Sequence, residues 1–501
     1  MLSALLLIPF LGGLTLLLLP SSLAPTRMRA IAIVFFALQL AVSLALLIPF
    51  DPANGGPQLQ ESLSWISSIG LDYRLAVDGL SLPLVLVNTS LCLVSAVCTR
   101  QLSQRPRLYF AMLLLISGAV NGAFLADNLL LFVIFYELEL IPLWLLIAVW
   151  GGANRSYAST KFLIFTAISG FLILAAFLGL AFVNGSVNFS ITPALTENLS
   201  VTTQLVLLIT MLIGFGIKIP LAPFHVWLPD AHTQASTPVS VLLAGVLLKL
   251  GTYGLIRFCL GLFPDVWPLV APALAAWAAF SVLYGSLAAI AQTDMKRMVA
   301  FSSVGHMGYV LLAAAAATPT ALLGSVFQMV SHGVISALLF LLVGIVYRKT
   351  GTRDLEVLRG LLNPERGLPF TGTLMILGVM ASAGLPGMAG FISEFLVFQG
   401  SIKLFPIATL LCIVGSGLTA VYFLLLVNRA FFGRLAVTPS SEDASADARL
   451  DVQLMPVAPR ETVPALALAL AVVGIGLVPS GLAHISDSAT SLLSQLHGGL
   501  G

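Results

Sequence analysis

Long apolar stretches recur along the whole chain and limit what it can fold into. A helix needs about 20 apolar residues to cross the hydrocarbon core of a bilayer. Cutting the chain at its polar, charged and Gly/Pro-rich interruptions gives fourteen such stretches, at residues 2–20, 29–50, 76–98, 108–125, 128–149, 162–183, 203–227, 236–258, 267–291, 297–317, 321–347, 369–400, 405–432 and 462–483. The pattern predicts an all-α membrane protein of about 14 transmembrane helices.

Composition supports a membrane protein and narrows its partners. Of the 501 residues, 58% are hydrophobic and 9% are charged, whereas soluble domains carry about 25% charged residues. The net charge is +2, so no basic excess indicates nucleic acid. We therefore expect the lipid bilayer, and no nucleic acid, among the partners of this chain.

The placement of lysine and arginine tests the number of spans. Loops on the cytoplasmic side of a membrane are enriched in these residues. If the loops that follow odd-numbered spans face that side, they collect 18 of the 23 basic residues. One miscounted span would remove this bias, so the bias supports an even number of spans. Both termini then lie on the side of the membrane opposite the basic loops.

A few ionisable residues interrupt the apolar spans. A charged side chain at the bilayer centre costs about 2.5 to 3.5 kcal/mol, so each needs a partner or a water-filled path. We select six as a candidate proton path: Glu137, Lys218, Lys249, His306, His332 and Glu394. The alternative is that these residues form structural ion pairs and capped histidines that hold the helices together.

Two of the six residues lie beside helix breakers. Pro220 and Pro223 follow Lys218, and Pro386 precedes Glu394. Proline removes a backbone hydrogen bond, which a membrane tolerates only where the freed groups meet protein or water. Broken helices in both halves of a chain are typical of transporters built from repeats.

The residue types suit proton transfer. A buried lysine loses its electrostatic support and releases a proton when its carboxylate partner is drawn away. Histidines between such sites can relay the proton because they titrate near neutral pH. Glu139 is either functional or structural, because it can face away from Glu137 and lies nearer the end of its span. For His225 and His232 we favour a structural role.

Five segments together resemble a known family, the antiporter-like, proton-translocating subunits of complex I of the NuoM/NdhD type (NAD(P)H-quinone oxidoreductase chain 4). The segments are 135–142 (FYELELIP), 218–232 (KIPLAPFHVWLPDAH), 247–251 (LLKLG), 294–308 (DMKRMVAFSSVGHMG) and 384–394 (GLPGMAGFISE). The resemblance extends from about residue 70 to 430. Within the family, the ELELIP stretch looks like the cyanobacterial and chloroplast NdhD form.

The resemblance implies a fold with two inverted five-helix repeats and broken seventh and twelfth helices. It divides the chain into helices 1–3 (1–107), a first repeat (108–260), a second repeat (261–433), and a loop, helix 14 and tail (434–501). It implies that Glu137 pairs with Lys218, that Lys249, His306 and His332 continue the path, and that Glu394 ends it.

The resemblance also implies partners. The chain has no GxGxxG fingerprint after a strand and no cysteine cluster, since its four cysteines are scattered. Electron transfer is therefore expected in partner subunits that hold NAD(P)H or ferredoxin, quinone and iron–sulfur clusters, with no cofactor in this chain. The other membrane-arm subunits of such a translocase would adjoin this chain in a thylakoid or plasma membrane, and the NdhD form reduces plastoquinone in photosynthesis.

Four other functions fit some of the same residues. One is a subunit of a multi-subunit Na⁺/H⁺ antiporter, which shares the buried lysines, and a related one is the membrane arm of a variant complex that concentrates carbon dioxide. A membrane cytochrome would use His306 and His332 as axial haem ligands. A structural scaffold would keep the fold without transport.

Overall fold

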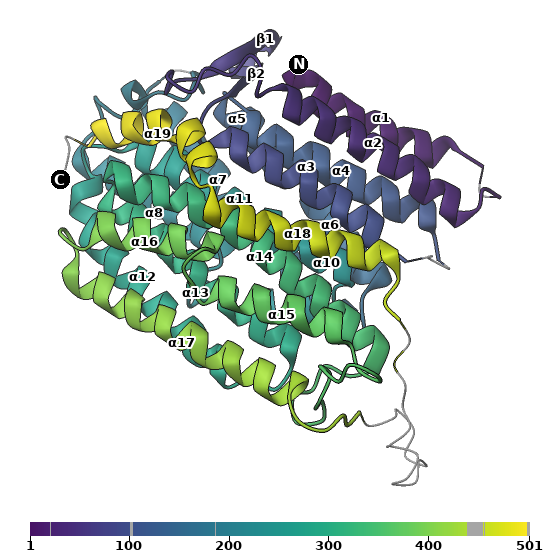
Figure 1. Ribbon diagram of the computed structural model, residues 1–501. Coiled ribbons are helices and arrows are strands. Elements are labelled where there is room, and N and C mark those ends of the chain that lie inside the picture. The colour runs from purple at the N-terminus through teal and green to yellow at the C-terminus, as the bar shows by residue number, and fades with distance from the viewer. Residues whose placement is uncertain (21, 101–103, 186, 438–453, 455, 498–501) are drawn as a thin grey trace.

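The computed structural model describes residues 1–501 except 21, 101–103, 186, 438–453, 455 and 498–501. The described residues are almost entirely helical, and the helices run roughly side by side (Figure 1). Of these helices, 12 are long and apolar enough to cross a membrane, and two shorter ones, Leu2–Leu18 and Pro369–Ser382, are also apolar. These fourteen match the fourteen predicted spans, so the chain is a multi-pass all-α membrane protein.

The first helices form one side of the molecule (Figure 1). They are α1 (Leu2–Leu18), α2 (Pro25–Ala45), α3 (Ser81–Cys98) and α4 (Pro106–Leu125). Between α2 and α3 the chain forms a hairpin of two antiparallel strands, β1 (Gln58–Ile66) and β2 (Leu71–Val77), which the sequence analysis did not predict. We call the end of the molecule that carries this hairpin the hairpin end.

The next helices bring the first break. They are α5 (Leu129–Leu138), α6 (Leu140–Trp150), α7 (Arg155–Val183), α8 (Val201–Lys218) and α9 (Trp227–Gln234). The chain between α8 and α9 is non-α-helical, with a short 3₁₀ turn at Phe224–Val226, as Pro220 and Pro223 predict. The indole N–H groups of Trp227 and Trp277 donate to the carbonyls of Ile217 and Ala222 beside the break. Protein groups therefore satisfy backbone that a lipid environment would leave unpaired.

The following span also departs from a regular helix. It consists of α10 (Thr237–Leu242), a π-helical segment (Leu243–Leu247), α11 (Leu248–Gly254) and a second π-helical segment (Leu255–Leu260). π-Helical turns inside α-helices frequently mark functional sites. Lys249 is the second residue after the first of them.

The second half contains α12 (Trp267–Ile290), α13 (Met295–Ala316), α14 (Pro319–Thr350), α15 (Pro369–Ser382), α16 (Ala389–Ser401) and α17 (Pro406–Phe431). The break between α15 and α16 confirms the predicted interruption of the twelfth span. Gly384 and Gly387 adopt positive φ angles of 71° and 88° there, a conformation that glycine reaches without strain.

The spans that hold the central candidates lie in the middle of the protein. The apolar windows of the Thr237–Leu260 span, α13 and α14 are 100% buried inside the protein. A helix that is hydrophobic all round belongs in such a core. Lys249, His306 and His332 are therefore shielded from lipid by other helices.

The chain ends with α18 (Pro459–Leu477) and α19 (Ser480–Gln495). Helix α18 crosses in front of α14 (Figure 1), and α19 returns along the hairpin end, where the Ser488 hydroxyl donates to the Pro52 carbonyl over 2.7 Å. The sequence analysis predicted a tail where α19 stands. Much of the loop predicted after residue 433 lies outside the described residues.

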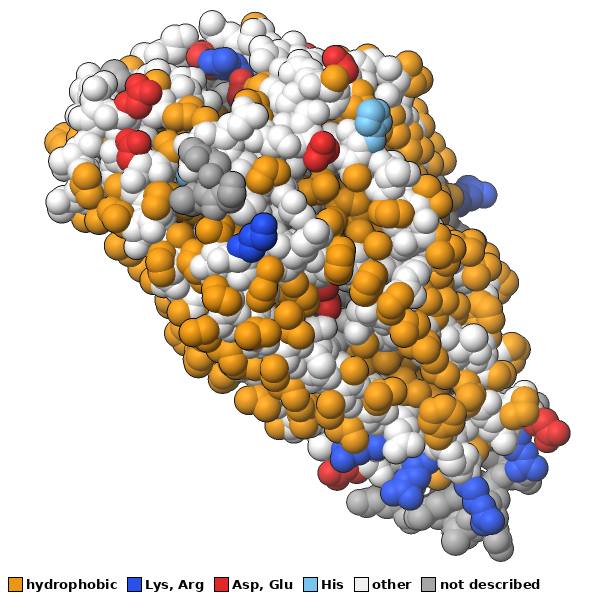
Figure 2. Space-filling model, turned by 60° about the vertical axis from the view of Figure 1, so that its left-hand side comes forward, with side chains coloured by type: hydrophobic (Ala, Val, Ile, Leu, Met, Phe, Trp, Pro, Cys, Tyr) orange, Lys and Arg blue, Asp and Glu red, His pale blue; other side chains and the backbone are white. Residues whose placement is uncertain are grey.

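The surface follows the expected polarity. Hydrophobic side chains cover the middle of the molecule, and Lys and Arg side chains gather at its lower end (Figure 2). We call that end, where α3 and α14 finish and α18 begins, the basic end.

Candidate ion path

Lys218 is paired with Glu139 at the first helix break. Lys218 is the last residue of α8, and Glu139 lies at the junction of α5 and α6. Both residues are 0% exposed, and the Lys218 ammonium donates to Glu139 Oε1. The same ammonium lies over the Tyr136 ring, 4.6 Å from its centroid. A buried lysine is thus held by one carboxylate and one aromatic face.

This pair corrects the expected partner. The family resemblance paired Lys218 with Glu137, but Glu139 occupies that position. Residues two apart on a helix point about 200° away from one another, so the two glutamates leave this span in different directions, and Glu139 is the one that forms the ion pair. The rotation of α5 and α6 turns Glu139 inward.

Glu137 points toward α7 instead. A methyl group placed on Gly170 of α7 would lie 1.8 Å from Glu137 Oε1, so the glycine makes room for the carboxylate. Glu137 is partly exposed, and its Oε1 is buried without a hydrogen-bond partner among the described residues. Glu137 therefore lies beside the Lys218–Glu139 pair without belonging to it.

Lys249 begins a second polar group. Its Nζ donates to the Ala244 carbonyl over 2.6 Å, within the π-helical segment, and lies 2.8 Å from His332 Nδ1 of α14. His332 Nε2 has no hydrogen-bond partner among the described residues. An ammonium and an imidazole are therefore within direct proton-transfer distance in the protein interior.

The row continues to the second helix break. The rings of His332 and His306 lie 5.6 Å apart between centroids, and His306 Nε2 lies 3.8 Å from Glu394 Oε1 on α16. Both ring nitrogens of His306 face backbone carbonyls, Nδ1 that of Ser302 at 2.8 Å and Nε2 that of Ser382 at 3.1 Å. Either nitrogen can therefore hold a proton against an acceptor.

Glu394 ends this row. It is buried, and the hydroxyl of Ser416 on α17 donates to its Oε2 over 2.6 Å. The structure thus brings Lys249, His332, His306 and Glu394 together from four separate spans, α11, α14, α13 and α16.

The two groups approach each other where α8 and α11 pack closely. A methyl group on Gly251 would lie 2.9 Å from both the backbone nitrogen and Cγ1 of Ile219, the residue after Lys218. Gly251 is two residues beyond Lys249. Between the two lysines, the described residues provide packed backbone rather than a direct hydrogen bond.

Comparison with known proteins identifies the family. The model of the family described as "NADH:quinone oxidoreductase/Mrp antiporter, TM" matches residues 126–419. The "NAD(P)H-quinone oxidoreductase chain 4 1" of Synechococcus sp. (strain JA-3-3Ab) is 41% identical, covering 100% of this chain and 94% of that protein. The chain belongs to this family. A Nostoc chain 4 protein is 37% identical over 98% of this chain and 90% of its own length.

Solved structures agree with this membership. A chain of respiratory complex I from Thermus thermophilus with bound NADH superimposes with a TM-score of 0.86 at 28% identity, covering 100% of both chains. A chain of the Mrp complex from Dietzia sp. has a TM-score of 0.85 at 23% identity, covering 100% of this chain and 99% of that chain, and shows the shared fold. As a member of the chain 4 family, the protein is a proton-translocating membrane subunit of an NAD(P)H-quinone oxidoreductase complex.

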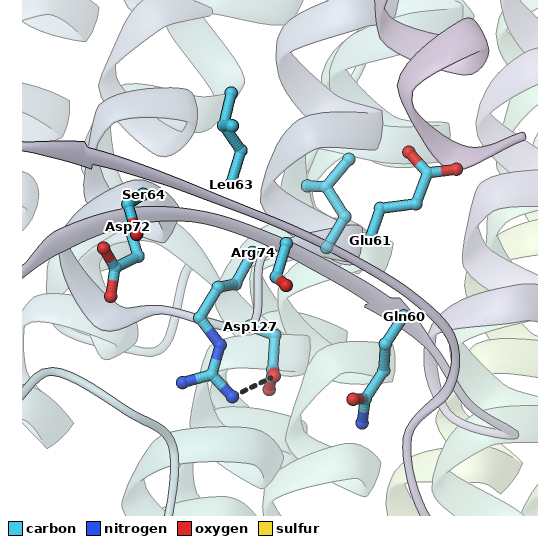
Figure 3. A pocket seen from close by; sticks show the side chains of 9 residues that line it. Gln60, Glu61, Leu63, Ser64, Asp72, Arg74 and Asp127 are labelled. Atoms are coloured by element: carbon cyan, nitrogen blue, oxygen red, sulfur yellow. Dashed lines mark hydrogen bonds and ion pairs between the residues drawn. The ribbon is translucent and has the colours of Figure 1, made fainter.

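Two pairs of charged residues lie outside the predicted path, at the hairpin end of the protein. At the hairpin end, Arg257 pairs with Asp78 and its Nε lies 3.2 Å from the Tyr253 hydroxyl. Beside them Arg74 and Asp127, 3.5 Å apart, line a pocket of about 350 Å³ under the hairpin (Figure 3). Burial raises the pKa of the Asp127 carboxyl, and the guanidinium groups of Arg74 and Arg257 oppose that shift.

Sequence reasoning missed the Asp78–Arg257 pair. An arginine inside the Thr237–Leu260 span was the available signal, because an arginine in a membrane segment requires a partner. The partner lies 179 residues earlier, so the sequence alone could not name it.

Polar residues at the basic end form their own pairs. Asp230 accepts from Lys161 over 2.7 Å and from Arg297 over 3.2 Å, and Asp294 pairs with Arg353 at 3.2 Å. The ring of His232 stacks on Phe340 with centroids 4.3 Å apart. Both ring nitrogens of His232 are buried without a hydrogen-bond partner among the described residues, so its structural role stays a prediction.

The described residues contain no group of three or more His, Cys, Asp or Glu side chains placed to hold a metal ion. Because the protein belongs to the chain 4 family, we assign it as a quinone oxidoreductase subunit instead of a membrane cytochrome. The hydrogen-bonding positions of His306 and His332 in the polar row agree with this assignment.

Proposed function

We propose that protons move through this chain along its buried polar residues, in the plane of the membrane. The observation that carries this proposal is the row Lys249, His332, His306 and Glu394, with contacts of 2.8 Å at one end and 3.8 Å at the other. Each member can take up and release a proton, and apolar helices isolate the row from lipid.

In the proposed transfer, the Lys249 ammonium gives a proton to His332 Nδ1. His332 then releases a proton from Nε2 toward His306, and His306 passes one from Nε2 to Glu394 Oε1. The rings of His332 and His306 are 5.6 Å apart between centroids, and the last step spans 3.8 Å, so each of these two transfers requires a side-chain movement or a bridging water. The neutral amine that remains on Lys249 is recharged from the Lys218 side.

The Lys218–Glu139 pair controls the first half of this path. A buried ion pair stabilises both charged forms, and separating its members removes that stabilisation. Because Lys218 ends α8 at a helix break, a shift of the break would draw it away from Glu139 and favour proton release. We propose that Glu137, beside this pair on α5, exchanges protons with it.

We also propose that the two halves act as repeats. Residues 108–260 contain the break beside Lys218, and residues 261–433 contain the break before Glu394. Each break carries one ionisable residue of the path. Residues 1–107 and 434–501 would then flank the two transport units.

The redox chemistry is proposed for partner subunits. The relatives' name, NAD(P)H-quinone oxidoreductase, indicates an electron donor and a quinone. We propose that the donor is NAD(P)H or ferredoxin, that iron–sulfur clusters carry the electrons, and that the acceptor is plastoquinone, because the similar chain 4 proteins come from cyanobacteria. The membrane would then be a thylakoid or plasma membrane.

Donor-driven proton uptake in sealed membranes tests the function. The Lys249→Ala variant is compared with the unmodified complex, with assembly and quinone reduction measured in parallel. We expect assembled complexes whose proton uptake per electron is lost. Unchanged uptake per electron would contradict the proposed row.

The same membranes distinguish the Na⁺/H⁺ antiporter alternative, which the fold of the Mrp chain brings forward. An antiporter subunit would exchange sodium for protons without any electron donor. We expect no proton movement from a sodium gradient alone, and sodium-driven uptake would favour the antiporter.

A further inference from the structure

An apolar groove lies on the side of the protein formed by α3, α14, α18 and α19. Its volume is about 450 Å³, and Ser90 is the one polar residue among those that line it. The residues that line it include Leu86 and Val94 of α3, Val330 and Val334 of α14, and Leu468 and Ile475 of α18. The groove follows the helix axes from the hairpin end toward the basic end.

The groove borders the lipid phase. Its front wall, α18, exposes Val463, Leu466 and Leu470 to 63%, 43% and 64%. In a membrane-spanning helix, apolar side chains with this exposure face hydrocarbon. The surface beside the groove is therefore apolar.

A cluster of cations stands at the basic end of the same three helices. Arg100 follows α3, Arg348 and Lys349 lie in the last turn of α14, and Arg460 lies in the first turn of α18. Arg100 and Arg460 are close enough to Arg348 for their charges to act on it, and Arg348 and Arg100 act on Lys349 in the same way. The basic cluster is thus one electrostatic unit.

One cation of the cluster, Arg348, already has a carboxylate partner. Buried Glu461 pairs with Arg348. Arg100, Lys349 and Arg460 form no ion pair with any described residue, and the Arg460 Nε is buried without a hydrogen-bond partner among them. The described part of the basic cluster therefore retains a positive surplus.

The cluster and the groove lie at a distance that one lipid spans. Ala467, at the near end of the groove, is seven residues from Arg460 on α18, or ~10 Å along a helix. We propose that an anionic membrane lipid binds here, with its headgroup at Arg100, Lys349 and Arg460 and an acyl chain in the groove. Basic pockets between transmembrane helices suit anionic headgroups.

The bound acyl chain would pack against the helix that carries His332. Val330 and Val334 line the groove on either side of His332 in the sequence of α14. The lipid would thereby complete the packing behind the polar row.

Photo-crosslinking tests the proposal on the assembled complex in vesicles. The probes are phosphatidylglycerol and phosphatidylcholine that carry a diazirine in the acyl chain, and labelled peptides are mapped. We expect phosphatidylglycerol to label α3, α14 and α18 more strongly than phosphatidylcholine does. The double variant Arg100→Gln/Lys349→Gln should remove this preference, whereas Arg155→Gln, an exposed basic residue elsewhere, should retain it.

Filling the groove tests the acyl chain separately. Ala471→Phe should abolish labelling of the groove by both lipids. Equal labelling by the two lipids, no effect of the double variant, or crosslinks from the groove to another subunit instead of to lipid would overturn the proposal. If Ala471→Phe fails to assemble, the surface double variant alone decides.

Discussion

The two helix breaks hold their ionisable groups in different ways. At the first, the broken helix supplies the cation, Lys218, and the junction of α5 and α6 supplies Glu139, joined in a direct ion pair. At the second, the broken helix supplies the acid, Glu394, which lies 3.8 Å from His306 and accepts a hydrogen bond from Ser416. The first break holds a fixed pair of charges, and the second a looser donor and acceptor. The comparison suggests that the first half controls release of the proton and the second half receives it.

Among changes at the two breaks, removing the lysine from the first should have the largest effect. Lys218→Ala leaves Glu139 buried without its cation, and an isolated buried carboxylate takes up a proton and becomes neutral. We therefore expect the complex to assemble while proton uptake falls roughly tenfold or more, since each loss of about 1.4 kcal/mol of pairing shifts the protonation equilibrium tenfold.

Sealed membranes with matched amounts of complex provide the measurement. Lys403→Ala, an exposed lysine in the short connection between α16 and α17, is the control and should pump normally. Full pumping by Lys218→Ala would show that the pair is structural.

Changing the acid at the second break should have a smaller effect. Glu394→Gln keeps a side chain that can accept from Ser416 but cannot exchange protons, so we expect proton uptake to fall several-fold with little change in thermal stability. The same assay, with a thermal melt of the purified complex, checks both. A large loss of stability would mean that Glu394 holds α16 and α17 together rather than serving transport.

Disturbing the neighbour of the first pair should have the smallest effect on transport. Gly170→Ala places a methyl group against the Glu137 carboxylate, and overpacking of this kind costs about 1–3 kcal/mol. We expect a lower melting temperature and slightly reduced pumping, because Glu139 and Lys218 remain paired.

The matched control is Gly417→Ala on α17, where an added methyl group meets nothing within 4 Å. Equal melting temperatures for the two variants would contradict the position of Glu137 beside Gly170.

Much of this fold could be predicted because the sequence signals of transmembrane helices are local. Span length, the prolines after Lys218 and before Glu394, and the distribution of basic residues are all read from short windows. The nine-residue strand Gln58–Ile66 and the amphipathic helix α19 were both missed because neither contains the long continuous apolar run by which the spans were recognised.

The partner of Lys218 required the structure. Glu137 and Glu139 are both in the same span, and which one faces inward depends on the rotation of that span against its neighbours. Tertiary packing fixes this rotation, so the sequence motif alone could not identify the partner of Lys218. The π-helical segment Leu243–Leu247, next to Lys249, could not be predicted either, since nothing in its residues departs from an ordinary apolar helix.

The most direct test compares proton uptake per electron in Glu139→Gln and Glu137→Gln complexes. The geometry predicts that Glu139→Gln, which removes the negative partner of Lys218, loses most of the uptake, while Glu137→Gln retains more. If Glu137→Gln abolishes pumping and Glu139→Gln does not, the Lys218–Glu139 pair is not the controlling element of the path.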